Sequence, residues 1–118
     1  MARGRKEVKS IKSYGKLKER KETKYIKVTQ YALNDKDPKV ILRNSQKAGY
    51  LFFPHHYLIT ADGAINKFRP EEAVAFGEVA HYDTTISVLA DITEEAQASL
   101  EAVINALQEK YKGAEVVE

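Results

Sequence analysis

The sequence predicts an α/β fold in which helices flank a single mixed β-sheet. Three observations carry this prediction. Segments rich in β-branched and aromatic residues alternate along the chain with segments that show helix-capping residues and helical periodicity. The 118 residues, 43% of them hydrophobic, suffice for one domain with one core. No apolar run approaches the roughly 20 residues needed to cross a bilayer.

The charge of the chain is divided unevenly. Residues 1–24 carry ten Lys and Arg against three Glu, a net +7, whereas the remaining residues carry nine against fourteen acidic residues, a net −5. We therefore predict a basic N-terminal arm over residues 1–23, flexible or bound to a partner, and one domain over residues 24–118. The arm residues expected to contact an acidic partner, nucleic acid among the candidates, are Arg3, Arg5, Lys6, Lys9, Lys12, Lys16, Lys18, Arg20 and Lys21.

The residue types limit the possible chemistry. The chain has no cysteine, which excludes disulfides, cysteine nucleophiles and thiolate metal sites. Any metal site would have to use carboxylates and the three histidines, His55, His56 and His81. No apolar stretch follows the basic N-terminus, so we expect no secretory signal peptide and a location in the cytoplasm or in a virion.

The first half of the domain contains a strand, a helix and a hairpin. Residues 24–32 are rich in strand-forming residues and predict the first core strand. Asp37 can cap a helix over residues 39–47, because Pro38 suits its first turn. Residues 57–68 predict a β-hairpin, because the turn signal Asp62-Gly63 separates strand-forming residues.

The second half repeats the alternation. Residues 84–90 predict another strand, and Thr93 then caps a long helix. Gly113 ends that helix, and residues 114–117 begin a further strand. The apolar stripe of the helix recurs at intervals of three and four residues and comprises Ala96, Leu100, Val103, Ile104, Leu107 and Tyr111.

Two polar pairs flank the hairpin. His55 and His56 precede it, and in an extended segment adjacent side chains point to opposite faces. We therefore expect one histidine to face the core side and the other to face away, so that the two cannot chelate a metal together. Glu71 and Glu72 follow Pro70 and are expected to form a solvated turn.

Four short motifs occur in a distinctive order. They are His56-Tyr57-Leu58-Ile59 with Asp62-Gly63, Arg69-Pro70-Glu71 with Ala73-Val74-Ala75, Thr85-Ile86-Ser87-Val88, and Thr93-Glu94-Glu95-Ala96-Gln97 with Leu100 and Tyr111. This series, over roughly residues 24–117, resembles the zinc-dependent N-acetylmuramoyl-L-alanine amidases. That family includes phage lysozymes of the amidase type and the peptidoglycan recognition proteins.

The resemblance implies a zinc ion with three protein ligands, but the ligands do not carry over. The family's first ligand is a histidine in the first core strand, where this chain has Thr29 or, with a one-residue slip, Gln30. The other two ligands follow the last helix, a segment for which this chain is C-terminally short. His55 replaces a tyrosine near the zinc, and Gly77 replaces a histidine common before the third strand.

We therefore expect a non-catalytic amidase-like protein, without catalytic residues, cofactor or bound metal. It would act as a structural or interaction module, for example a phage virion or assembly component. A protein partner or a second copy would dock where Val116, Val117 and the sheet edge near Thr29 are expected to be exposed.

Three alternatives remain open. The chain could bind cell-wall peptide in a groove formed by His55, His81 and Tyr82, with Thr29 nearby. It could be an active amidase, completed by a missing C-terminal segment or by an unusual metal site in which His55 and His81 converge with Asp83 or Glu78. It could bind nucleic acid through the arm alone, in which case affinity would fall steeply with salt.

Overall fold

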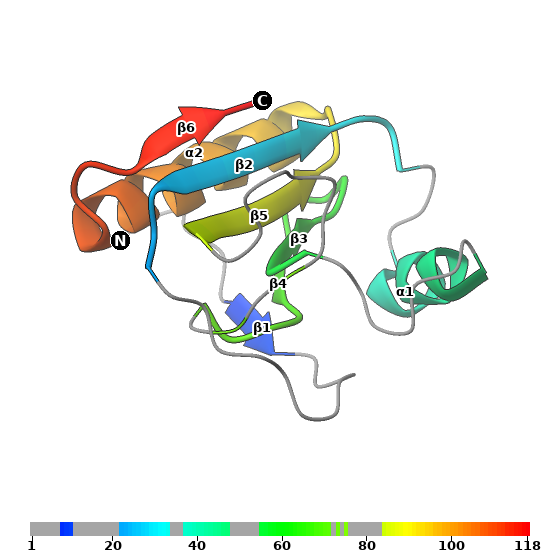
Figure 1. The fold of residues 1–118 in the computed structure, drawn as a ribbon. Coiled ribbons are helices and arrows are strands. Elements are labelled where there is room, and N and C mark those ends of the chain that lie inside the picture. The colour runs from blue at the N-terminus through cyan, green and yellow to red at the C-terminus, as the bar shows by residue number, and fades with distance from the viewer. Residues whose placement is uncertain are drawn as a thin grey trace.

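The chain folds around one sheet in the computed structural model, which describes residues 8–10, 22–33, 37–47, 55–71, 73, 75 and 84–118. The elements in chain order are β1 (Val8–Ser10), β2 (Tyr25–Gln30), α1 (Pro38–Lys47), β3 (Tyr57–Ile59), β4 (Ile65–Lys67), β5 (Thr85–Ala90), α2 (Glu94–Lys110) and β6 (Glu115–Val117). The strands lie in the order β1-β4-β3-β5-β2-β6 (Figure 1). The predicted α/β fold with a single mixed sheet is confirmed.

The sheet is mixed because of the hairpin. β3 and β4 pair antiparallel, whereas the pairs β1–β4, β3–β5, β5–β2 and β2–β6 are parallel. The register sets Leu58 beside Leu89, and Leu89 beside Thr29. One row earlier, Ser87 lies beside Lys27. These rows place residues from three distant parts of the sequence on one face of the sheet.

The hairpin turn has the residue types it requires. Gly63 has a φ of +83°, which an L side chain rarely adopts. The Gly63 N–H donates to Thr60 O at 2.9 Å, and the Asp62 carboxylate accepts from the Thr60 hydroxyl at 2.6 Å. The Thr60 N–H donates to Ala64 O at 3.1 Å. The predicted Asp62-Gly63 hairpin is confirmed.

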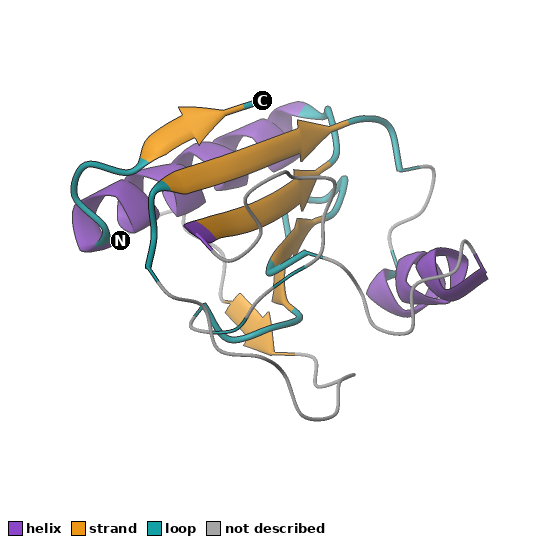
Figure 2. Cartoon of the chain, viewed as in Figure 1, coloured by secondary structure: helices purple, strands orange, loops and turns teal. Residues whose placement is uncertain are grey.

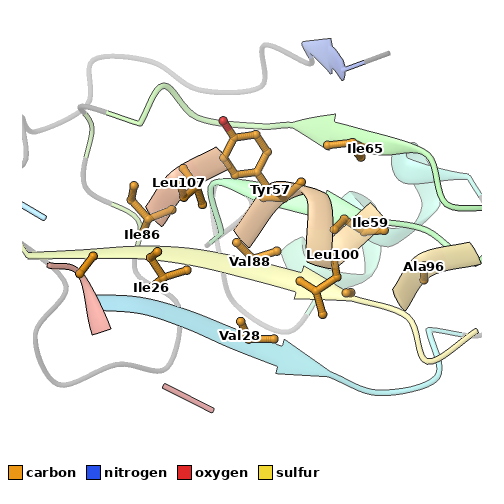
Figure 3. Packing of buried hydrophobic residues seen from close by; sticks show 13 residues of the cluster. Ile26, Val28, Tyr57, Ile59, Ile65, Ile86, Val88, Ala96, Leu100 and Leu107 are labelled. Carbon is orange, nitrogen blue, oxygen red and sulfur yellow. The ribbon is translucent and has the colours of Figure 1, made fainter. Parts of the chain in front are cut away.

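Each face of the sheet has its own apolar cluster. The helix α2 covers one face of the sheet (Figure 2). On that face Ile86 and Val88 of β5 pack with Leu100 and Leu107 (Figure 3), and Ala90 belongs to the same cluster. Alternate residues of a strand point to opposite faces, so Ser87 and Leu89 point the other way. There the smaller cluster joins Leu58, Leu89 and Phe68 to Ile41 of α1.

Both helices begin as their sequences predict. Asp37 accepts the Lys39 N–H at 2.9 Å through its side chain, and its carbonyl accepts from Val40 and Ile41. The Thr93 hydroxyl oxygen accepts the Ala96 N–H at 3.1 Å and so caps α2. Within the described residues, neither helix is long and apolar enough to cross a membrane.

β1 lies inside the segment predicted to be the basic arm. It pairs in parallel with β4, with Val8 beside Ile65 and Ser10 beside Lys67. Of the predicted arm contacts, only Lys9 has a described backbone position, opposite Asn66. The others, from Arg3 to Lys21, lie outside the described residues, and the domain boundary at residue 23 stays a prediction.

Candidate functional site

His56 is fully buried, and the backbone engages both of its ring nitrogens. The Ser87 N–H donates to Nδ1 at 3.0 Å, so Nδ1 carries no proton. The proton is therefore on Nε2, which donates to the Ala73 carbonyl at 2.6 Å. This neutral ring joins β5 to the segment after the hairpin, and neither nitrogen has a lone pair available for a metal.

His55 contacts the side chain of the same serine. Its Nδ1 lies 2.6 Å from Ser87 Oγ, and the residue is 9% exposed. Burial, and secondarily the charge of Arg69, lower the pKa of His55 from 6.5 to about 4. Arg69 is itself 4% exposed, and burial lowers its pKa. At neutral pH His55 is therefore an uncharged residue beside a buried guanidinium.

The expectation that one of the two histidines faces away from the core is wrong. Both are buried, and both rings contact Ser87, one through its side chain and one through its backbone N–H. The reason is local geometry: residues 55–56 form a bend before β3, so the strict alternation of an extended strand does not apply to them.

Thr29 lies on the same sheet face as Ser87, but in an apolar row. Its register partner is Leu89, which in turn lies beside Leu58, and both leucines belong to the cluster against α1. Ser87 and His55 are one row away, which is two residues or about 7 Å along the strand. The structure thus places Thr29 and His55 on one face, with leucine side chains in the row of Thr29.

The other predicted site residues, His81 and Tyr82, lie outside the described residues, as do Glu78 and Asp83. The predicted exposure near the last strand is met in part: Val116 and Val117 are half-buried, and Val116 packs against the main core. β6 pairs with residues 25–27 of β2 only. Beside Thr29, therefore, no described strand pairs with the edge of β2 that faces away from β5.

A second polar cluster lies on the α2 side of the sheet, around Glu71. This residue is 8% exposed and accepts three hydrogen bonds. The Tyr57 hydroxyl donates to Oε2, while Lys110 Nζ and the Tyr111 hydroxyl donate to Oε1 at 2.9 and 2.8 Å. The Lys110 ammonium also lies 5.3 Å from the centroid of the Tyr111 ring.

The three donors keep Glu71 ionised. Burial alone would raise the pKa of its carboxyl, but the hydrogen bonds from Tyr57, Lys110 and Tyr111 and the charge of Lys110 outweigh burial and lower that pKa to about 2. The hydrogen bond to Glu71 in turn raises the pKa of Lys110. Burial, and then Glu71, raise the pKa of Tyr111. The cluster therefore holds a stable charge pair at neutral pH.

The sequence does not predict this cluster. The expectation that Glu71 is part of a solvated turn is wrong, because its carboxylate turns inward to groups 14, 39 and 40 residues away in the sequence. The sequence pattern predicts Tyr111 only as part of the apolar stripe of the helix. A tyrosine at the end of such a stripe is the one available signal, since a buried hydroxyl requires a polar partner.

Comparison with known proteins places the fold. The chain superposes on the N-acetylmuramoyl-L-alanine amidase LysC from Clostridium intestinale with a TM-score of 0.80 and 20% identity, covering 93% of this chain and 80% of that one. It superposes on the Ph2119 endolysin of a Thermus scotoductus bacteriophage with a TM-score of 0.76 and 19% identity, covering 92% and 84%. Drosophila PGRP-LB gives 0.70 and 10%, covering 93% and 81%.

The chain has the N-acetylmuramoyl-L-alanine amidase fold. This confirms the resemblance at the level of fold, since identities of 20% and below show no more than that. No family model and no curated protein matches the sequence.

The resemblance to zinc-dependent amidases implies a zinc ion, and the described residues do not fit it. They contain no group of three or more histidines and carboxylates that could hold a metal ion. His56 uses both ring nitrogens on the backbone, and Thr29 lies beside leucines. A tetrahedral zinc site requires three convergent nitrogen or oxygen ligands, which this face does not supply in the part of the chain that the structure describes.

Proposed function

We propose that this chain is a non-catalytic protein of amidase fold that acts as an interaction module, for example in a phage particle or its assembly. One observation carries the proposal. The position that the resemblance gives to the family's first zinc ligand holds Thr29, which is not a zinc ligand, and it lies in a row with Leu89 and Leu58.

The face around Thr29 supports the same proposal. Amide hydrolysis by a zinc enzyme needs an open coordination position and a metal-bound water. The row of Thr29 instead contains Leu89 and Leu58, and His55 is neutral and buried against Ser87. A scaffold that retains its sheet while its first ligand position carries a threonine is suited to binding.

Two surfaces would meet a protein partner or a second copy. The first is the edge formed by β6 and the outer side of β2, where Val116 and Val117 are half-buried. The second is the basic arm, whose net charge of +7 over residues 1–24 complements an acidic surface. An edge strand with adjacent apolar side chains readily pairs with another chain.

The proposal is tested by activity and binding measured on the same preparation. The full chain, equilibrated with zinc, is incubated with muropeptides, and it is separately mixed with insoluble peptidoglycan. We expect no peptide to be released above the protein-free control. We also expect the chain to self-associate or to capture a protein partner, and this association should depend on residues 1–23 or on Val117. Zinc-dependent release of peptide would overturn the non-catalytic assignment.

Cell-wall peptide binding is the second candidate. The partly open face of β2 favours it, because Lys27 and Thr29 are only half-buried there beside the buried Ser87. Structures of similar fold include PGRP proteins and amidases. Saturable retention on peptidoglycan that is reduced by Lys27→Ala, without hydrolysis, would establish this candidate in place of the first.

A further inference from the structure

A pocket of about 140 Å³ opens between α2 and the hairpin, on the face of the sheet opposite to Thr29 and His55. Its walls are Tyr57, Ile65, Glu71, Ala102, Val103, Ala106, Leu107 and Lys110. Figure 3 shows Tyr57, Ile65 and Leu107 on this side of the sheet. The pocket is separate from the histidines and belongs to no role proposed above.

The pocket has an apolar body. Ala102 and Ala106 are one helical turn apart and only half-buried, and their small side chains leave space that Val103, Leu107 and Ile65 do not fill. An apolar cavity of about 150 Å³ admits a molecule the size of benzene. The pocket therefore has room for roughly six non-hydrogen atoms.

One end of the pocket is anionic. The Glu71 carboxylate lies there, ionised because the Tyr57 and Tyr111 hydroxyls and Lys110 donate to it. The positions of the two tyrosines are fixed by the backbone, since Tyr57 belongs to β3 and Tyr111 caps the C-terminal end of α2. Lys110 is the exchangeable donor, since its side chain is 56% exposed and sits on a flexible stem.

We propose that this pocket binds a primary ammonium group carried on a short alkyl chain. The alkyl chain occupies the apolar body, and the ammonium replaces Lys110 as a hydrogen-bond donor to Glu71. After this exchange the buried carboxylate still has a positively charged hydrogen-bond donor. A buried charge without such a partner would be strongly destabilising. Such a ligand is either a free amine or the side chain of a lysine presented by a partner, and the two share one chemistry.

The test follows the alanine methyl signals of the full chain by NMR while three matched probes are added. The probes are n-pentylammonium, 1-pentanol and pentanoate, which share an alkyl chain and differ in charge. We expect n-pentylammonium to shift the Ala102 and Ala106 methyl signals with a dissociation constant of about a millimolar. We expect pentanol to bind at least tenfold more weakly and pentanoate not to bind.

Three variants connect the binding to the pocket. Ala106→Leu fills the apolar body and should abolish binding while the rest of the spectrum is retained. Glu71→Gln should abolish it by removing the charge. Lys110→Ala removes the competing ammonium and should tighten binding roughly three- to tenfold, an effect that a merely structural role of the cluster would not produce.

A fourth probe, Nα-acetyl-lysine amide, distinguishes the two sources. Shifts of the same methyl signals would identify a partner's lysine side chain as an acceptable ligand, whereas binding of n-pentylammonium alone would restrict the site to free amines. Absence of binding by either ammonium, equal binding of pentanoate, or binding unchanged in Ala106→Leu would overturn the proposal. None of these outcomes depends on whether the chain is catalytic.

Discussion

Glu71 illustrates how a buried carboxylate can stay ionised. Its burial opposes the charge, but Tyr57, Lys110 and Tyr111 each donate to it. Hydrogen bonds to a charged group contribute roughly 1.5–3 kcal/mol each in favourable cases, so three together outweigh the desolvation cost. The carboxylate thereby ties the hairpin and the segment after it to the C-terminal end of α2.

The pH dependence of stability should report this charge. The pKa of Glu71 is about 2 in the folded protein against an ordinary value of 4.5, so its contribution is complete above pH 4.5 and is lost as the pH falls through 2. We expect Glu71→Gln to lower the free energy of unfolding by about 2–3 kcal/mol at pH 7. The difference from the wild type should shrink between pH 4.5 and 2, as measured by urea denaturation. A difference independent of pH would contradict this account.

His55 should affect the free energy of unfolding at a higher pH than Glu71 does. Its pKa is about 4 in the folded protein against 6.5 ordinarily, so the unfolded chain binds the extra proton first. Its stabilising contribution is complete above pH 6.5 and is lost as the pH falls towards 4, a decline of roughly 2–3 kcal/mol. In His55→Asn this decline should disappear. A proton NMR titration with a His55 midpoint near 6.5 would refute the assignment.

The hairpin turn lies directly against α2. The Ser99 hydroxyl donates to Gly63 O at 2.6 Å, and the Thr93 hydroxyl donates to Ala61 O at 2.6 Å. A Cβ built on Gly63 would lie 2.9 Å from Glu95 O, a backbone atom that cannot give way without moving the helix. Gly63 therefore meets two requirements at once, a positive φ and a close approach.

A pair of glycine substitutions separates the two requirements. Gly63 and Gly113 both have positive φ, +83° and +91°, but a Cβ on Gly113 meets nothing within 4 Å. We expect Gly113→Ala to cost about 1 kcal/mol from backbone strain alone. Gly63→Ala should cost about 3 kcal/mol, because the clash with α2 adds to the strain. Equal losses in denaturant unfolding would show that the turn does not pack tightly on the helix.

The sequence predicts most of the fold because the signals for its elements are local. Thr93 caps α2, Asp37 caps α1, and the Asp62-Gly63 turn places the hairpin, each within a few residues of its partners. The Glu71 cluster could not be predicted in the same way. Its donors come from β3, the last residue of α2 and the residue after it, and only the tertiary structure brings them together.

The site was predicted less well than the fold. Thr29 and His55 share one sheet face but lie in neighbouring rows, and a common site there stays a prediction. The expected orientation of the histidines is wrong because a bend replaces the extended segment. The ring contacts of His56 to Ser87 N–H and Ala73 O involve backbone atoms, which carry no sequence signal of their own.

At the scale of the whole molecule, the charge divides into a net +7 over residues 1–24 and a net −5 over the remaining residues, and the arm is a prediction from this division. β1 pairs with β4, so part of the arm belongs to the sheet. Replacing five basic residues by Gln removes five positive charges and changes no residue of β1; the five are Lys12, Lys16, Lys18, Arg20 and Lys21. We expect affinity for a polyanionic partner to fall and its dependence on salt to flatten, measured by fluorescence anisotropy at several salt concentrations. An unchanged slope would show that the arm is not the contact.

We propose that this chain works without the zinc chemistry that its resemblance to the zinc-dependent amidases implies. The measurement that tests it most directly is the zinc content of the purified full chain after equilibration with zinc and dialysis without chelator. We predict less than about one-tenth of a zinc ion per chain, since the described donors do not converge. One zinc ion per chain, lost on His55→Ala or His81→Ala, would contradict the claim and make the chain a candidate hydrolase.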